Sequence, residues 1–160
     1  MVSFLCFCRS SAAVTPFEPL TAEAVREWAV NFDNLLNSKR GQKEFLSYLK
    51  KEHSECNFLF WQSVEKLKAE SNQGTVKEMV HTIYHDFLAA EAVMQININA
   101  TNQGIAREAL GNPTPHAFDP VQQEIYGLMK RDSYGRYIRS DSYKELLASF
   151  EPEGTNSVTN

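Results

Sequence analysis

The sequence has few cysteines, and their arrangement does not suit a disulfide-stabilised protein. Cys6, Cys8 and Cys56 are the whole set, and the first two stand only two residues apart. An odd number in a chain of 160 residues does not suggest a disulfide framework. We therefore expect a reducing compartment, and the cytoplasm is the simplest case.

The sequence also lacks a long apolar run and an excess of basic residues. No apolar stretch approaches the roughly 18 residues that a membrane-spanning helix needs. The apolar patch at 2–8 has no basic residue before it, so it makes a poorly formed signal peptide. The net charge of −4 argues against a nucleic-acid partner. With 42% hydrophobic and 22% charged residues, the composition is that of one folded domain.

What the sequence does contain is helical periodicity along most of its length. Apolar residues recur every three or four positions in the segments 24–30, 45–49, 58–67, 79–88 and 121–129. No segment alternates as a half-buried strand would. The pattern therefore predicts an all-α fold of eight or nine short helices.

Local signals predict where the helices and the domain begin and end. TVKE at 75–78 fits a capping box, and DPVQ at 119–122 places an N-cap before a proline. Gly111 is typical of a helix end. We expect the folded domain at 19–150, with flexible segments on either side, at 1–18 and 151–160.

Polar residues stand directly before an aromatic run in the middle of the chain. Ser54, Cys56 and Asn57 precede FLFW at 58–61, and Ser54 taken alone predicts an N-cap for the helix that follows. We expect five aromatic side chains in the core: Phe58, Phe60, Trp61, Phe87 and Tyr126.

The sequence offers no catalytic or metal-binding constellation. His53 and Cys56 have the spacing of a thiol–imidazole pair, but nothing supplies an orienting amide or an oxyanion hole. His81 and His85 have the spacing of a metal pair, but no third ligand is evident. We therefore expect no catalytic residue, no metal and no cofactor.

Two long motifs and two short ones occur in a fixed order. EHSECNFLFW at 52–61 is similar to the signature E-x-S-E-x-N-hydrophobic-x-F-W, and IYGLMKRDSYGRY at 125–137 to I-Y/F-x-L-M-x-x-D-S-Y-x-R-F/Y. QINI at 95–98 is similar to a loop with a central Asn, and WAVNFD at 28–33 to the opening of the same domain. On these motifs the sequence resembles the regulator of G-protein signalling (RGS) domain over residues 24–150.

The resemblance implies a fold and a function. The fold would be about nine helices in two lobes, an antiparallel four-helix bundle and a lobe of terminal helices. The protein would be a monomeric GTPase-activating protein for Gα subunits of the i/o or q class, acting on the GTP-bound form. It would hold the switch segments in their transition-state shape and donate no catalytic group. The alternative is an RGS-like scaffold that binds without accelerating hydrolysis.

The resemblance also implies a set of contact residues on this chain: Glu52, Ser54, Glu55, Asn57, Asn97, Leu128, Asp132, Ser133 and Arg136. Simpler interpretations stay open for several of them. Asn97 lies in a polar loop, and Asp132 and Arg136 have the spacing of an ion pair within one helix.

The chain departs from the family pattern at two positions and carries one further feature. Cys56 stands where most relatives have a second Glu, which predicts weaker Gα binding or a shifted Gα preference. Gly135 is unusual in the second motif and predicts a loss of stability of about 1 kcal/mol. Cys6 and Cys8 follow apolar residues, and their S-acylation would place the protein at the inner face of the plasma membrane. The alternative is a plain flexible segment with free thiols.

Overall fold

The computed structural model describes residues 19–150, and this part of the chain is helical without strands. The predicted segments 1–18, with Cys6 and Cys8, and 151–160 lie outside the described residues. The elements are α1 (Ala22–Val30), α2 (Phe32–Asn37), α3 (Lys39–Lys51), α4 (Cys56–Lys68), α5 (Gln73–Ile83), the π-helical turn η1 (Tyr84–Leu88), α6 (Ala100–Gly111), α7 (Asp119–Arg131), α8 (Ser133–Arg139) and α9 (Asp141–Ala148). The all-α prediction is confirmed.

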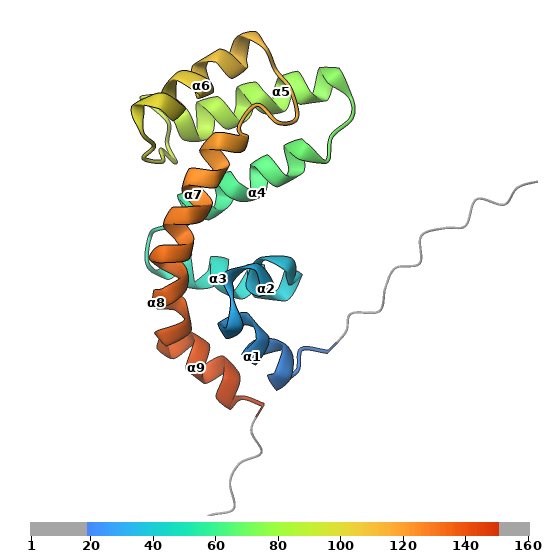
Figure 1. Ribbon diagram of the computed structural model, residues 1–160. Helices are drawn as coiled ribbons and strands as arrows, with labels where there is room; N and C mark the ends of the chain where they lie inside the picture. The colour runs from blue at the N-terminus through green and yellow to red at the C-terminus, as the bar shows by residue number, and fades with distance from the viewer. Residues whose placement is uncertain (1–18, 151–160) are drawn as a thin grey trace, which may run out of the picture.

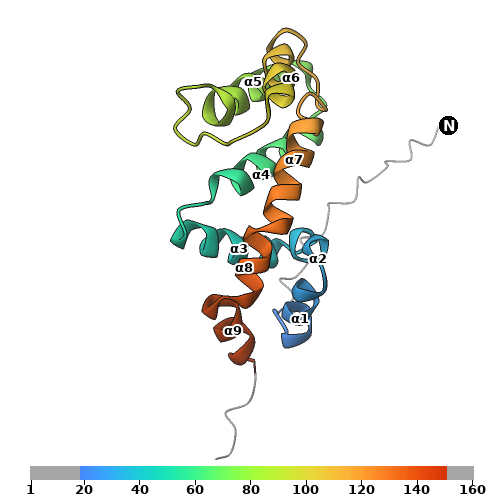
Figure 2. The same cartoon turned by 60° about the vertical axis from the view of Figure 1, so that its left-hand side comes forward.

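The helices pack in two groups, one above the other in Figure 1. In the upper group α4, α5, α6 and α7 contact one another in turn, and η1 packs on α5 and α6. In the lower group α2 contacts α1 and α3, and α9 contacts α8 and α1. Helices α7 and α8 follow each other directly and connect the two groups (Figures 1 and 2).

The two ends of the described chain are tied together by tyrosine hydroxyls. Tyr143 Oη of α9 donates to the Val25 carbonyl of α1 at 2.8 Å, and Tyr134 Oη of α8 donates to the Trp28 carbonyl at 2.9 Å. These bonds close the lower group although its helices come from opposite ends of the sequence.

The phenylalanines of the aromatic run in α4 lie in the middle of the core, as predicted. Phe58 and Phe60 are fully buried, and Phe58 meets Phe45 of α3 edge to face at 5.4 Å between ring centroids. Such a ring buries about 150–250 Å² and dominates local packing energy. Trp61 and Tyr126 are only half-buried and line the edge of this core.

Two predicted helix starts are wrong in detail. α5 begins at Gln73, not after Thr75, because Asn72 is itself a good N-cap and its Oδ1 accepts the Thr75 N–H at 3.1 Å. Asp119 is the first residue of α7, one position later than an N-cap. Gln122 lies in the first turn of α7, and its Nε2 donates across to the Trp61 carbonyl of α4 at 3.1 Å. The predicted end at Gly111 is confirmed.

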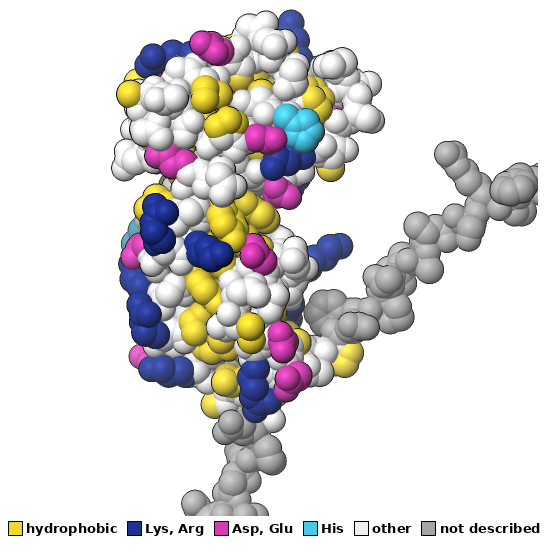
Figure 3. All heavy atoms as spheres, viewed as in Figure 1, with side chains coloured by type: hydrophobic (Ala, Val, Ile, Leu, Met, Phe, Trp, Pro, Cys, Tyr) yellow, Lys and Arg dark blue, Asp and Glu magenta, His cyan; other side chains and the backbone are white. Residues whose placement is uncertain are grey.

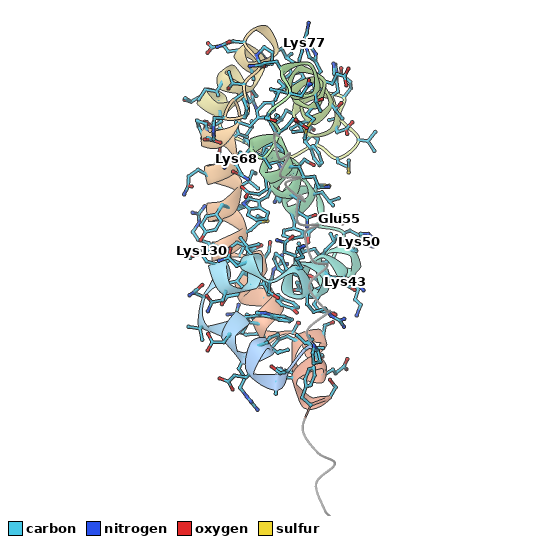
Figure 4. All side chains as sticks on the ribbon, turned by 90° about the vertical axis from the view of Figure 1, so that its right-hand side faces the viewer. Lys43, Lys50, Glu55, Lys68, Lys77 and Lys130 are labelled. Carbon is cyan, nitrogen blue, oxygen red and sulfur yellow. The ribbon has the colours of Figure 1, made fainter. Side chains whose placement is uncertain are left out.

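The upper group is held together by polar contacts as well as by the core. Lys68 at the end of α4 lies between α4 and α7 in Figure 4, and its Nζ is 3.3 Å from Asp119 Oδ1. None of the described helices is both long enough and apolar enough to cross a membrane.

Candidate functional site

The turn that leads from α3 to α4 is a tight helix-ending motif. The His53 N–H donates to the Lys50 carbonyl at 3.2 Å, and the Ser54 N–H donates to the Leu49 carbonyl at 2.9 Å. This pair of bonds is the Schellman pattern, which places one residue in the left-handed region. That residue is His53, with φ 51°, and it is the sole non-glycine residue with positive φ among residues 19–150. The turn is therefore fixed by backbone bonds before α4 begins.

The prediction that Ser54 is the N-cap of α4 is wrong. α4 begins at Cys56 after Glu55, and no side chain caps its first turn. Ser54 belongs to the end of α3 instead, where its Oγ lies 3.5 Å from the Leu49 carbonyl that its own N–H already binds. The physical reason is that the Schellman turn uses Ser54 as its second residue after the helix.

The loop 89–99 between η1 and α6 is held at several points. Ile96 is 5% exposed, and its N–H donates to the Phe87 carbonyl at 3.0 Å. Gln95 Nε2 donates to the carbonyls of Ala89 and Ala90 at 3.2 and 3.3 Å. Asn97 follows the buried Ile96 and is exposed. The loop therefore presents the Asn97 side chain from a fixed backbone.

The α3–α4 turn and the loop 89–99 lie on the same side of the molecule, one above the other, with α7 beside them (Figures 1 and 2). They enclose a surface hollow of ≈ 210 Å³ that we call the amide hollow. Its lining residues are His53, Ser54, Cys56, Asn57, Gln95, Ile96, Asn97 and Leu128. Four predicted contact residues are thus brought together from three segments of the chain.

The two asparagines of the amide hollow keep their hydrogen-bonding capacity. Within residues 19–150 no hydrogen bond involves the side chain of Asn57 or Asn97, although Asn57 is half-buried. Each amide offers two N–H donors and one acceptor oxygen. Leu128 is 37% exposed and adds an apolar wall beside them. The hollow therefore suits a polar backbone or amide group with an apolar neighbour.

Three predicted residues form a separate group, which we call the charged cluster: Glu52, Asp132 and Arg136. Arg136 Nη2 lies 3.1 Å from Asp132 Oδ2 one helical turn away, so the predicted intrahelical pair is confirmed. Arg136 Nη1 also lies 3.5 Å from Glu52 Oε2 at the end of α3. All three side chains are 41–60% exposed, so each pair contributes about 1 kcal/mol or less. The cluster orients its carboxylates more than it stabilises the fold.

The two remaining predicted contacts line neither feature. Ser133 begins α8 and is only 6% exposed. Glu55 precedes α4, is half-buried, and faces the same side as Lys50 in the view of Figure 4.

Figure 3 shows that the surface between the two helix groups narrows, with hydrophobic side chains exposed along the narrow part.

The Cys56 thiol is a neutral wall of the hollow rather than a nucleophile. Burial raises the pKa of this thiol above its ordinary value, and the neighbouring Glu55 carboxylate raises it further. A raised pKa lowers the thiolate fraction at neutral pH, and the thiolate is the form that attacks carbon or binds metal. Among the described residues no three His, Cys, Asp or Glu side chains come together in a metal-binding arrangement.

Sequence reasoning did not include some of the residues that shape the hollow. His53 was an unassigned position within the first motif, and nothing local indicates that it adopts positive φ. Ile96 stood in the quoted loop, and a lone apolar residue among polar ones is the available signal for a buried anchor. Glu124 carries no sequence signal, because its partners Asn99 and Asn102 lie at the start of another helix.

Sequence comparison with known proteins finds a matching family and several relatives of this chain. The profile of the regulator of G protein signaling domain matches residues 31–146. Regulator of G-protein signaling rgs-2 from Caenorhabditis elegans is 38% identical over 132 residues, which cover 82% of this chain and 78% of that protein. Regulator of G-protein signaling rgs-1 from the same species is 40% identical over 133 residues, covering 83% of this chain and 66% of that protein. Regulator of G-protein signaling 19 from Mus musculus is 38% identical over 140 residues, covering 87% and 64%.

This chain spans slightly less than two thirds of the length of the last two relatives. The likeness covers both long motifs, the amide hollow and the charged cluster. The chain belongs to the regulator of G protein signaling domain family.

Proposed function

We propose that this protein is a GTPase-activating protein for heterotrimeric G-protein α subunits and so attenuates their signalling. One observation carries the proposal: Asn57 and Asn97, whose amides make no side-chain hydrogen bond within residues 19–150, line a single hollow between preformed loops. Family membership supports a Gα subunit as the partner, and we propose that the form bound is GTP-bound Gα in its transition-state conformation. We keep the i/o and q classes as the candidates.

The chemistry of the partner explains why neutral amides are sufficient. A Gα subunit carries its charge-stabilising arginine in cis, so the activator need not donate one. The remaining barrier is the ordering of the switch segments and of the glutamine that orients water. A gain of about a hundredfold needs only ~2.7 kcal/mol. A few preorganised hydrogen bonds supply that amount. Asn57 and Asn97 make such bonds without desolvating a charge.

The charged cluster supplies the second part of the contact. Arg136 holds Asp132 at 3.1 Å, which leaves the carboxylate oriented to accept backbone N–H groups of a switch segment. Glu52 and Glu55 extend this acidic edge, and Leu128 packs against apolar side chains of the partner. We assign Ser133 a role at the α7–α8 turn, where its burial limits it to a small contact.

Single-turnover GTP hydrolysis by several Gα subunits tests the proposal. The protein is added in its native form and as Asn57→Ala, with Asn37→Ala as the matched control. Asn37 is an exposed asparagine at the end of α2 and does not line the amide hollow. We expect native protein and Asn37→Ala to accelerate hydrolysis and Asn57→Ala to lose most of the acceleration.

Binding to Gα loaded with GDP and aluminium fluoride separates an activator from a scaffold. An activator binds this transition-state mimic more tightly than the GTP-bound form. Equal affinity for both forms, with no acceleration of hydrolysis, would support the scaffold alternative instead.

We also propose that residues 19–150 are the folded unit. A separate proposal is that the protein works at the inner face of the plasma membrane. The basis is the apolar, cysteine-bearing start of the sequence, since two acyl chains hold a protein on a membrane where one binds only marginally. Fractionation of the full chain and of the variant Cys6→Ser/Cys8→Ser tests this. A double variant that stays on membranes would contradict it.

A further inference from the structure

Glu124 of α7 binds both the last loop residue before α6 and the first turn of that helix. Its carboxylate accepts the Asn99 N–H at 3.1 Å and Asn99 Nδ2 at 2.9 Å. It also accepts Asn102 Nδ2 at 2.6 Å, from a side chain that is 7% exposed. One carboxylate therefore ties the loop 89–99 and the start of α6 to α7.

We propose that Glu124 is a positioning residue that sets the place of Asn97 in the amide hollow, and so the affinity for the Gα switch segments. The effect of Glu124 on Gα affinity rests on the proposed function. The effect of Glu124 on the position of the loop 89–99 does not, because it concerns the free protein.

Asn97 lies between two anchored points of the loop 89–99. Upstream, Ile96 is buried and its N–H is bound by the Phe87 carbonyl at 3.0 Å. Downstream, Asn99 is bound by Glu124 through both backbone and side chain. Asn97 is exposed and stands between these two fixed points, so releasing either one frees its backbone.

Glu124 lies on the face of α7 that borders the amide hollow. Glu124 and Leu128 are four residues apart and share one face of the helix. Leu128 lines the amide hollow together with Asn97. The same face therefore forms one wall of the hollow and holds the loop that forms another wall. Glu124 thus fixes the separation between the two walls.

The side chains and backbone groups that bind Glu124 require a carboxylate at this position. All the groups that converge on Glu124 are N–H donors, and an ionised carboxylate is an acceptor without a competing donor. The Asn99 Oδ1 is already used to cap the Asn102 N–H at 2.9 Å. Glutamine at 124 would keep one oxygen but would turn an NH₂ group toward other donors. Glutamine should therefore preserve only part of the hydrogen bonding that the carboxylate provides.

Hydrogen exchange of the free protein tests the loop effect. The variants are Glu124→Ala and Glu124→Gln, and the control is Glu108→Ala. Glu108 is exposed near the end of α6, and its side chain makes no ion pair within the described chain. We expect the backbone amides of 97–103 to exchange about tenfold faster in Glu124→Ala, with a smaller change in Glu124→Gln. Exchange in α4 should stay unchanged, which shows that the variant is folded.

Gα activation tests the link to function through a split between affinity and maximal rate. A loose loop must be ordered when the partner binds, so the cost falls on affinity. We expect Glu124→Ala to raise the concentration for half-maximal acceleration about tenfold, equivalent to ~1.4 kcal/mol, and to keep the maximal rate. Glu124→Gln should recover part of the affinity, and Glu108→Ala should behave as the native protein.

Two results would overturn the inference. One is unchanged exchange at 97–103 in Glu124→Ala. The other is faster exchange with unchanged affinity for Gα, in an assay where Asn97→Ala weakens activation. Failure of the native protein to accelerate any Gα subunit would defeat the proposed function instead, and the exchange experiment would still decide whether Glu124 holds the loop.

Discussion

The amide hollow and the charged cluster lie next to each other but are prepared for a partner in opposite ways. In the hollow, Asn57 and Asn97 make no side-chain hydrogen bond within the described chain, and the rigidity comes from the backbone around them. In the cluster, Arg136 is bound on both sides by Glu52 and Asp132, so the side chains themselves are ordered. The hollow keeps its hydrogen-bonding capacity free, whereas the cluster has used part of its own.

The difference indicates which feature should carry more of the partner's binding energy. A neutral amide held on a fixed backbone loses little solvation and little entropy on binding. An exposed ion pair is screened by salt and contributes little by itself. We therefore expect the hollow to dominate activation and the cluster to modulate it.

Removal of both amides is the strongest test of this comparison. In Asn57→Ala/Asn97→Ala we expect acceleration of Gα hydrolysis to fall by about a hundredfold or more, because both donors to the switch segments are lost. Single-turnover hydrolysis measures the effect, and the melting temperature should change little because neither amide is bonded within the described chain. A double variant that retains half of the acceleration would mean that the hollow is not the site.

Loss of Arg136 should have a smaller effect. Arg136→Ala frees Asp132 and Glu52, and we expect acceleration to fall about tenfold. The free energy of unfolding should fall by about 1 kcal/mol or less, because the pairs are exposed. Denaturant titration and hydrolysis assays at two salt concentrations measure both. Arg139→Ala on the same helix is the control, since its guanidinium makes no ion pair within residues 19–150. Equal losses in the two variants would show that only the net charge matters.

Substitution of Cys56 tests whether the wall of the hollow sets partner preference. Cys56→Glu introduces the carboxylate that the family motif predicts at this position, and we expect affinity to change severalfold and unequally among Gα subunits. Binding to a panel of transition-state Gα complexes measures this. Unchanged affinity for all of them would contradict the hypothesis that the thiol matters for selectivity.

The pH dependence of Cys56 alkylation checks that its thiol is neutral. Because burial and Glu55 raise its pKa, the thiolate fraction at neutral pH is below that of a free thiol. Iodoacetamide should therefore react more slowly with Cys56 than with a peptide thiol at neutral pH, and the rate should level off at a higher pH than it does for the peptide thiol. The experiment uses a Cys6→Ser/Cys8→Ser background so that one thiol reacts. A rate that levels off near neutral pH would show an activated thiolate.

Gly135 tests the stability of the helix that carries the cluster. A Cβ at this position would meet only the Arg139 guanidinium, at an ordinary 3.6 Å. Gly135→Ala should therefore raise the free energy of unfolding by up to about 1 kcal/mol, since alanine favours the helix. Thermal denaturation measures this, and Gα activation should stay as in the native protein. A loss of activation would mean that α8 needs its flexibility.

The prediction from sequence was good where a signal repeats along the chain and poor where two local signals compete. The apolar stripes gave the all-α class, and FLFW at 58–61 gave buried phenylalanines. The start of α5 was misplaced because Asn72 and Thr75 are both good caps, and only packing chooses between them. Ser54 was misassigned because the same residue suits the end of one helix and the start of the next.

By itself, the sequence determined the all-α class, the buried phenylalanines, the family and the asparagines that stand near the aromatic run. Only the tertiary structure decided that Asn57 and Asn97 line one hollow, that Arg136 reaches Glu52, and that Glu124 holds the loop. The physical reason is the range of each interaction. Helix periodicity and capping act within a few residues, whereas the bonds that shape the hollow join helices whose approach depends on how the whole core packs.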